Sequence, residues 1–321
     1  MAAKCCLLGG GVTGPRAGDR PRAVITIGVF DGVHLGHQML IRRVVERAAE
    51  LGVEAGCVTF HPHPEDVLRP ESDIPHLGAL EDRLEAIREL GISLVEVIPF
   101  TWVLARETPE QFVDRLLTRF ILRELWVGSD FALGRGRSGT PDRLARIGMV
   151  RGFRVFTVPP VEWGGEVVSS SRIRALLTEG RVEEAAQLLG RPYRLRGRVV
   201  PGDGRGRHLG FATANLAVDE RLCVPGNGVY AVWAVLDGEQ PRPAVANVGL
   251  RPTFDGSTRA IEVHLLDFAD DLYGRLLAVD FVARLRGERR FGSVDALVEQ
   301  IRQDIASARL LLAAGPPHAR A

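Results

Sequence analysis

The stretch AVITIGVFDGVHLGH, residues 23–37, decides the fold of the N-terminal half. It opens with a short apolar run that predicts a buried strand, and a helical period begins near Gly36 and continues to Leu51. Short apolar runs and helical periods alternate in this way as far as residue 158, which predicts right-handed crossovers and a doubly wound parallel sheet. Ligands of such sheets lie at the carboxyl ends of the strands, where residues 28–37 fall.

The periodicity predicts the other elements of this half. Strands are expected at residues 23–29, 53–60, 94–99, 125–127 and 155–158, and helices at 36–51, 80–90, 109–120 and 142–150. The third of these helices has the clearest beginning, since Thr108 and Gln111 have the spacing of a capping box and Pro109 stands at the first helical position.

The pattern changes near residue 190. From residue 193 to 285, β-type runs are separated by Gly, Pro and Asp turns with no long helical period, which predicts a small antiparallel barrel or sandwich, and a terminal helix begins near Ser293. We therefore expect a disordered leader at 1–22, domains at 23–186 and 187–313, and a tail at 314–321.

The composition favours a soluble enzyme of small molecules. Forty-one basic and forty acidic residues nearly cancel, so the chain lacks the basic excess typical of nucleic-acid or membrane binders. Lys4 is the only lysine, which excludes a P-loop and a Schiff-base lysine. Four cysteines without framework spacing and no apolar run long enough to span a membrane predict a cytoplasmic protein. The sequence does not indicate an oligomeric state.

Two histidines follow the first strand. His34 and His37 share a face on the first turn of the predicted helix, and Gly36 between them lets a phosphate approach the backbone. The helix N-terminus supplies free N–H groups, so the segment can cradle a phosphate chain without lysine. Core or metal-binding histidines are the alternative, and the position after a strand between glycines favours phosphate.

Four motifs in order resemble one family. GVFDGVHLGH (28–37), TFHPHP (59–64), VGSDFALG (127–134) and VSSSRIR (168–174) are similar to the bacterial bifunctional riboflavin kinase/FAD synthetases, of the His-x-Gly-His nucleotidyltransferase superfamily. The resemblance implies adenylylation of FMN by ATP, with His34 and His37 stabilising phosphate charge. It also implies an ATP or phosphate site made by Gly28, Phe30, Asp31, Gly36, Asp130, Ser170, Ser171, Arg172 and Arg174.

Within the TFHPHP motif, His63 is expected to line the flavin. Ser169 also has the character of an ordinary helix N-cap. Zinc binding by Cys57 with the histidines at 61 and 63 is a weaker alternative to a substrate-lining loop.

A second candidate site lies in the C-terminal half. The loop VPGDGRGRHLG (200–210) is rich in glycine and arginine and can surround phosphate with N–H groups, although surface hairpins have the same composition. Thr213 and Asn215 lie two apart on a strand and offer oxygen ligands of the kind that Mg²⁺ prefers. Alone, they read equally as a strand threonine and a turn asparagine.

Later segments place this loop in context. ATAN (212–215), NVGLRPTF (247–254) and IEVH (261–264) resemble the riboflavin kinase module. The resemblance implies that Thr213 and Asn215 place Mg²⁺ and that Glu262 takes the proton of the riboflavin hydroxyl. It further assigns ATP contacts to Gly202, Arg207 and Gly210 and flavin contacts to Asn247, Gly249, Arg251 and Thr253.

Ala212 departs from the family signature, which has proline there. Without the fixed φ of proline the metal loop should be looser, and we expect a slower kinase.

The sequence thus predicts an enzyme that makes FMN and then FAD from riboflavin and ATP. One alternative is a nucleotidyltransferase with a single activity on another phosphorylated compound, such as a pantetheine or glycerol phosphate. The other is a flavin-binding regulator with inactive sites, against which His34, His37 and Glu262 argue because a binder needs no base.

Overall fold

The computed structural model describes residues 5–6, 20–202, 206, 209–237, 239–253 and 256–316, with the backbone alone at 5–6, 251–253 and 256–258. The chain forms two compact units. The first contains the described residues up to Ile74 and those from Leu80 to Val168, and the second contains Pro75–Ala79 and the described residues from Ser169 onward.

The first unit is built on a parallel sheet. Its strands are β1 (Cys5–Cys6), β2 (Arg22–Ile27), β3 (Glu54–His61), β4 (Leu94–Pro99), β5 (Ile121–Gly128) and β6 (Arg154–Val158). They lie in the order β1-β4-β3-β2-β5-β6, and every pair is parallel. The predicted doubly wound α/β fold is confirmed. Strand β1 lies inside the predicted disordered leader, whose residues 1–4 and 7–19 lie outside the described part of the chain.

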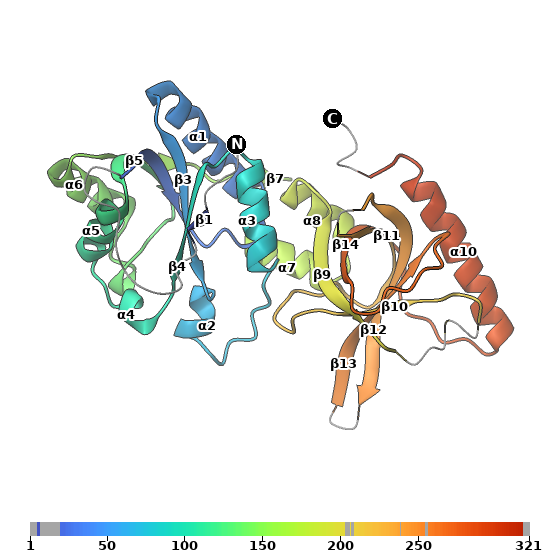
Figure 1. Ribbon diagram of the computed structural model, residues 1–321. Coiled ribbons are helices and arrows are strands. Elements are labelled where there is room, and N and C mark those ends of the chain that lie inside the picture. The colour runs from blue at the N-terminus through green and yellow to red at the C-terminus, as the bar shows by residue number, and fades with distance from the viewer. Residues whose placement is uncertain are drawn as a thin grey trace. The chain divides into compact units, whose positions relative to one another are not determined.

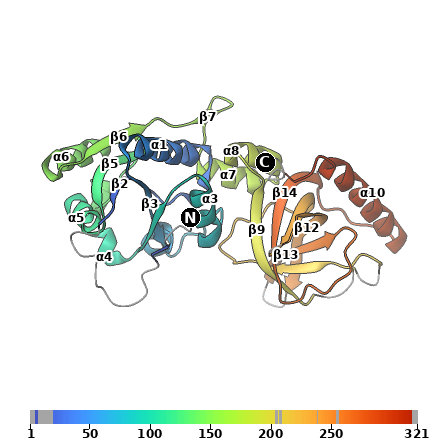
Figure 2. The same ribbon diagram turned by 45° about the horizontal axis from the view of Figure 1, so that its top comes forward.

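Helices cover both faces of this sheet (Figures 1 and 2). The helices are α1 (Leu35–Leu51), α2 (Pro64–Leu68), α3 (Leu80–Glu89), α4 (Trp102–Ala105), α5 (Pro109–Arg119) and α6 (Pro141–Arg151). Because side chains alternate along a strand, Val24 of β2 packs with α1 and α3, and Ile25 packs with α4, α5 and α6. The capping box of α5 is formed, with Thr108 Oγ1 accepting from Gln111 N–H at 3.3 Å and Gln111 Oε1 accepting from Thr108 N–H at 2.8 Å.

A buried carboxylate lies on β5, beside the border strand β6. Glu124 of β5 is 1% exposed and accepts hydrogen bonds from Arg47 Nε at 3.0 Å, Trp126 Nε1 at 3.0 Å and an Arg154 guanidinium nitrogen at 2.5 Å. Burial acts to raise the pKa of this carboxyl, but these donors outweigh it and hold the pKa below its ordinary value. The group is therefore paired as a buried charge must be.

The second unit is a closed antiparallel barrel. Its strands are β9 (Tyr193–Val200), β10 (Ala214–Ala217), β11 (Gly228–Leu236), β12 (Arg242–Thr253), β13 (Gly256–Leu265) and β14 (Leu276–Arg286), in the order β10-β13-β12-β11-β14-β9. Strand β9 pairs with β10 and closes the barrel. Helix α10 (Val294–Leu312) packs Ala308 and Leu312 against Val229 and Trp233. The predicted barrel and terminal helix are confirmed.

Two helices before the barrel belong to the second unit. Helix α7 (Ser170–Thr178) packs on α8 (Val182–Leu189), and α8 packs on β9 and β14. The compact units therefore divide after Val168, whereas the sequence placed the domain boundary between residues 186 and 187. The difference arises because the buried face of α8, which includes Val182 and Leu188, needs the barrel to cover it.

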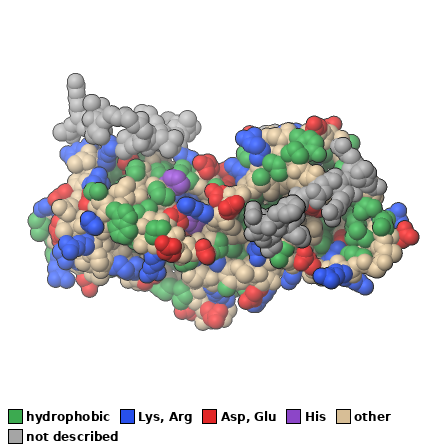
Figure 3. Space-filling model, turned by 90° about the horizontal axis from the view of Figure 1, so that it is seen from below, with side chains coloured by type: hydrophobic (Ala, Val, Ile, Leu, Met, Phe, Trp, Pro, Cys, Tyr) green, Lys and Arg blue, Asp and Glu red, His purple; other side chains and the backbone are tan. Residues whose placement is uncertain are grey.

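A short hairpin of β7 (Glu162–Trp163) and β8 (Glu166–Val167) precedes α7. Among the described residues, no helix is both long and apolar enough to cross a membrane. On the face drawn in Figure 3, basic and acidic side chains are interspersed.

Candidate functional site

The loop after β2 begins the first candidate site. At Phe30 the backbone is left-handed, with a φ of 55°, and the ring is buried at 2% exposure. The ring lies over Gly28, where an added Cβ would come within 2.9 Å of Phe30 Cζ. Glycine at 28 thus allows the chain to fold back on itself at the carboxyl end of the strand.

The two histidines stack at the start of α1. His34 is the N-cap, and its Nδ1 accepts from the His37 backbone N–H at 3.4 Å. The two rings lie 3.7 Å apart at 19°, and the Phe30 ring meets His37 edge-on at 5.2 Å. An added Cβ at Gly36 would lie 3.1 Å from His34 Cε1, so only glycine leaves this ring its position. The structure thus brings together His34, Gly36 and His37 as the sequence predicts.

One ring nitrogen of this pair has no protein partner. His37 Nδ1 is enclosed and makes no hydrogen bond among the described residues. A buried donor or acceptor without a partner is costly, so a ligand that bound here and supplied one would remove that cost.

The neighbouring strand also ends at this edge. Strand β5 pairs with β2, and the chain leaves the two strands toward opposite sides of the sheet, which makes this the topological switch point. Asp130 follows β5, is exposed, and folds back over Gly128, where an added Cβ would lie 3.1 Å from its Oδ1. Asp130 therefore belongs to the same strand edge as the histidines.

An arginine that the sequence analysis did not single out holds the loop in place. Arg83 of α3 is 8% exposed and donates to the carbonyl oxygens of Val29 at 2.7 Å and Phe60 at 2.9 Å. It thereby joins the ends of β2 and β3. The sequence did contain a signal for this buried arginine, because Arg83 lies next to Leu84 on the helix whose apolar face is formed by Leu80, Leu84 and Ile87.

The surroundings of His37 oppose its protonation. Desolvation by the enclosing protein, then the charges of His34 and Arg83, lower the pKa of His37 well below its ordinary value of 6.5. In the free protein His37 is therefore neutral near pH 7, and the negative charge of a bound phosphate would act in the opposite direction.

This depressed pKa predicts a pH-dependent stability. Below about pH 6.5 the unfolded chain binds a proton at residue 37 that the folded chain does not. The free energy of unfolding therefore decreases as the pH is lowered, until the folded pKa is reached. For each pH unit below 6.5, we expect the wild-type protein to lose up to about 1.4 kcal/mol more stability than His37→Gln loses. Urea unfolding of both proteins at pH 7.5 and 5.5 measures this, and equal losses would contradict it.

Three further residues in the motifs of the first half make structural contacts. His63 is the N-cap of α2, and its Nδ1 accepts from Glu65 N–H at 3.2 Å. Ser169 is the N-cap of α7, as expected, with Oγ accepting from Arg172 N–H at 3.3 Å. Arg174 Nε donates to the carbonyl of Pro75 at 2.6 Å. A phosphate role for Ser170, Ser171, Arg172 and Arg174 and a flavin role for His63 stay predictions.

The environment of Cys57 argues against the alternative of a zinc site with the histidines at 61 and 63. It is 1% exposed within β3, and burial raises the pKa of its thiol, which disfavours the thiolate that binds zinc.

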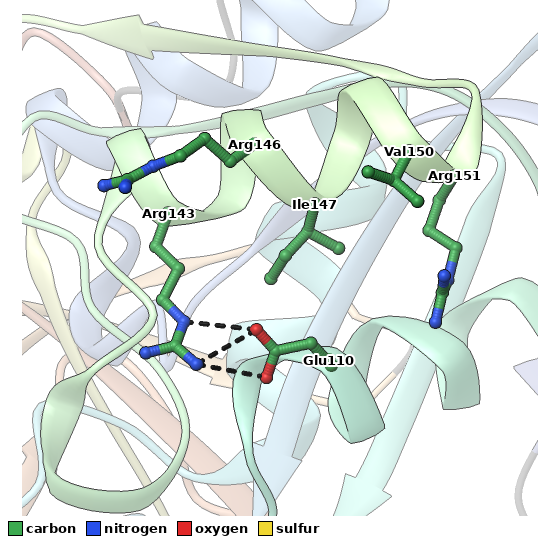
Figure 4. Close-up of a pocket in the computed structure, with 6 residues that line it drawn as sticks. All are labelled: Glu110, Arg143, Arg146, Ile147, Val150 and Arg151. Carbon is green, nitrogen blue, oxygen red and sulfur yellow. Dashed lines mark hydrogen bonds and ion pairs between the residues drawn. The ribbon is translucent and has the colours of Figure 1, made fainter.

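A cavity of about 420 Å³ lies elsewhere on this unit, between α5 and α6 (Figure 4). It is lined by Glu110, Arg143, Arg146, Ile147, Val150 and Arg151. Arg143 pairs with Glu110 at 3.0 Å and Arg151 pairs with Asp114 at 2.8 Å, so both of these charges are already matched. The cavity lies against the outer helices and takes no part in the histidine site.

The second candidate site is a row of polar residues across three strands of the barrel. Asn215 of β10 lies directly opposite Glu262 of β13, which in turn lies opposite Asn247 of β12. Their neighbours Ala214, Ala246 and Val263 are buried on the other face of the strands. Opposed residues project to the same side of a sheet, so the register brings Asn215, Glu262 and Asn247 together on the outer surface of the barrel.

The glycine-rich loop lies against this row. An added Cβ at Gly202 would lie 2.0 Å from Asn215 Nδ2, and one at Gly206 would lie 3.2 Å from Thr213 Oγ1. Gly210 has a φ of +87°, a conformation that favours glycine. Arg207 lies outside the described residues. The structure thus places the backbone at 202 and 206 against the two predicted metal ligands.

This contact predicts a selective effect of Gly202→Ala. The new methyl group must displace the Asn215 amide, because the two cannot occupy the same space. We expect a kinase rate lower by roughly 10-fold or more at low Mg²⁺, with partial recovery at high Mg²⁺. Initial rates of FMN formation across a Mg²⁺ series measure this. The FAD rate from supplied FMN is the control, and a kinase rate equal to wild type would contradict the prediction.

The predicted flavin residues follow along β12. Gly249 faces Glu288, whose Oε1 lies 2.6 Å from an added Cβ, and Glu288 Oε2 accepts from Asn227 Nδ2 at 3.0 Å. At Arg251 and Thr253 only the backbone is described, paired with Thr258 and Gly256. Glu288 was not predicted, since nothing in the sequence indicates that its loop returns to β12.

Comparisons with known proteins agree with this division. The riboflavin kinase family matches residues 189–312, and the FAD synthetase family matches residues 17–172. A bifunctional riboflavin kinase/FMN adenylyltransferase of Pseudomonas fluorescens is 44% identical over 292 residues, covering 90% of this chain and 93% of that protein. Proteins of the same name from Escherichia coli strain K12 and Bacillus subtilis strain 168 are 38% and 37% identical, each covering 89% of this chain and 91% of the relative.

One solved structure shares the whole architecture. It is described as a macrolide-efflux protein from Streptococcus pneumoniae, and it superposes with a TM-score of 0.83 at 32% identity, covering 90% of this chain and 94% of its own. The description concerns that protein, and the likeness shows that the two-unit fold is shared.

Proposed function

The chain belongs to the bifunctional riboflavin kinase/FMN adenylyltransferase family, and from that premise we propose how its two sites divide the synthesis of FAD. The C-terminal domain, 187–313, phosphorylates riboflavin with ATP to give FMN. The N-terminal domain, 23–186, transfers the adenylyl group of a second ATP to FMN and releases pyrophosphate. ATP, as a substrate of both steps, argues for a cytoplasmic enzyme.

In the kinase step Glu262 is the general base. Its carboxylate takes the proton of the terminal ribityl hydroxyl, the oxygen attacks the γ-phosphorus of ATP, and ADP leaves. The Asn215–Glu262–Asn247 row supports this role, because Asn215 and Asn247 lie directly opposite Glu262 on the two neighbouring strands. Flavin contacts would come from Asn247, Gly249, Arg251 and Thr253 along β12.

Thr213 and Asn215 would hold the magnesium ion of this step. Their hydroxyl and amide oxygens are of the type that Mg²⁺ takes, and the loop glycines at 202 and 206 leave room for them. When bound, the ion supplies neutralisation of the charge that develops on the transferred phosphate. The backbone of the loop, with Gly202, Arg207 and Gly210, would surround the ATP phosphates.

In the adenylylation step an FMN phosphate oxygen attacks the α-phosphorus of ATP, and pyrophosphate leaves without a covalent enzyme intermediate. Catalysis then depends on positioning and on charge stabilisation. His34 and His37 supply donors at the N-terminus of α1, and the unpartnered His37 Nδ1 is the observation that supports their role. Gly28, Phe30, Asp31 and Gly36 would shape the phosphate loop, and Asp130 would contribute to the ATP site from the end of β5.

The test is chromatography of products after the protein is incubated with riboflavin, ATP and Mg²⁺. FMN followed by FAD is the expected result. FAD from supplied FMN, with no product from riboflavin, would leave the chain with the first activity alone. No pyrophosphate from ATP and FMN and no FMN from riboflavin would mean a flavin binder and would overturn the proposal.

A further inference from the structure

The segment that carries Thr213 is attached to the strand that carries Glu262. His264 Nδ1 lies 2.8 Å from the carbonyl oxygen of Ala212, and the Phe211 ring meets the His264 ring edge-on at 5.8 Å. A carbonyl oxygen can only accept, so this bond requires the tautomer of His264 with a proton on Nδ1. The contact joins the residue immediately before Thr213 to β13.

The position of His264 relates it to the base. It lies two residues after Glu262 on β13 and therefore projects from the same face of the strand. The Leu209 and Phe211 N–H groups donate to the Gly206 carbonyl at 3.1 and 2.8 Å and form a tight turn. The ladder between β10 and β13 begins only at Ala214, so the His264 bond adds a contact to the strand of the base at Ala212, between this turn and the ladder.

This link has particular value in this chain. Ala212 is exposed and, unlike a proline, leaves φ free at the residue before the metal ligand. A side-chain hydrogen bond to its carbonyl restricts the same residue from its other side, at the peptide that joins it to Thr213.

We propose that His264 is a positioning residue of the kinase site, which holds the Ala212 carbonyl and so fixes Thr213 at the start of the strand whose ladder places Asn215 opposite Glu262. The inference rests on the proposed kinase function. It assigns His264 an action through the metal ligands, so its loss should alter the Mg²⁺ requirement more than the rate at saturating Mg²⁺.

The experiment compares wild type with four variants, His264→Ala, His264→Asn, Ala212→Pro and the double variant His264→Ala/Ala212→Pro. Rates of FMN formation are measured across a Mg²⁺ series at saturating riboflavin and ATP, and binding of Mg²⁺ to each chain in the presence of ADP is measured by calorimetry without turnover. We expect His264→Ala to raise the half-maximal Mg²⁺ concentration about 10-fold, as loss of a residue that orients a metal ligand commonly does. Asn retains a donor near the Nδ1 position and should recover part of the loss.

Rescue is the decisive comparison. Ala212→Pro should lower the Mg²⁺ requirement of the His264→Ala chain, because it restricts the same residue by another route. Arg275→Gln, which removes the 2.5 Å pair with Glu239 at another loop of the barrel, should leave the requirement unchanged. The FAD rate from supplied FMN reports in every variant that the chain is folded.

Two outcomes would overturn the inference. One is a His264→Ala chain with the Mg²⁺ requirement of wild type. The other is a double variant, His264→Ala/Ala212→Pro, that needs as much Mg²⁺ as His264→Ala alone. Failure of the proposed function is a separate result, since wild type would then form no FMN from riboflavin at all.

Discussion

A His37→Ala enzyme given riboflavin, ATP and Mg²⁺ will accumulate FMN and form almost no FAD. The substitution removes one of the two stacked imidazoles at the N-terminus of α1, whose Nδ1 has no partner among the described residues. Loss of one donor that stabilises transition-state charge costs roughly 10²–10³ in rate, and we expect FAD formation from FMN to fall by that factor.

Riboflavin phosphorylation serves as the internal control, because residue 37 belongs to the first unit and the kinase row to the second. Product chromatography over time measures both rates in one sample. A variant that makes FAD at the rate of wild type would remove His37 from the mechanism. One that loses both activities would indicate a folding defect rather than a catalytic one.

The second large effect is expected at Glu262. Glu262→Gln keeps the shape of the side chain but removes the base, so riboflavin phosphorylation should fall by roughly 10²–10⁴. FAD formation from supplied FMN should be unchanged, the reverse of the result for His37→Ala.

The matched control for this variant is Glu239→Gln, which neutralises a carboxylate elsewhere in the barrel that pairs with Arg275. The measurement is the initial rate of FMN formation at saturating ATP and Mg²⁺. A Glu262→Gln kinase with more than a tenth of the wild-type rate would mean that another group takes the proton.

Much of the first unit could be predicted from the sequence because its signals are local. The capping box at Thr108, the apolar runs of the strands and the histidine pair at a helix start each depend on residues within one turn or one strand. The short elements α2, α4, β7 and β8 were not predicted, since two to five residues carry too little periodicity. Helix α8 was not predicted either, and the domain boundary was placed inside it, although Val182, Ala185 and Leu188 have helical spacing.

In the candidate sites, too, the features that depend on local patterns could be predicted and those that depend on strand register could not. Alternation along β13 predicted that Glu262 and His264 share a face, and the structure confirms that Ile261 and Val263 are the buried pair. The register that places Asn215 and Asn247 on either side of Glu262 is a property of three strands far apart in sequence, and no local pattern specifies it. The Arg83 bridge between β2 and β3 is of the same kind, since its acceptors are backbone carbonyls that carry no side-chain signal.

Closure of the barrel also affects how the two units behave when crowded. A barrel has no free strand edge, so β9 to β14 offer no open row of N–H and C=O groups on which a second chain could add. The parallel sheet ends instead at β6, which pairs with β5 on one side. The arginine that β6 presents to Glu124 also places a charge on that border, a common protection against edge-to-edge aggregation. Pairing of one chain with another through a strand edge is therefore confined to the parallel sheet, whose border strands are β1 and β6.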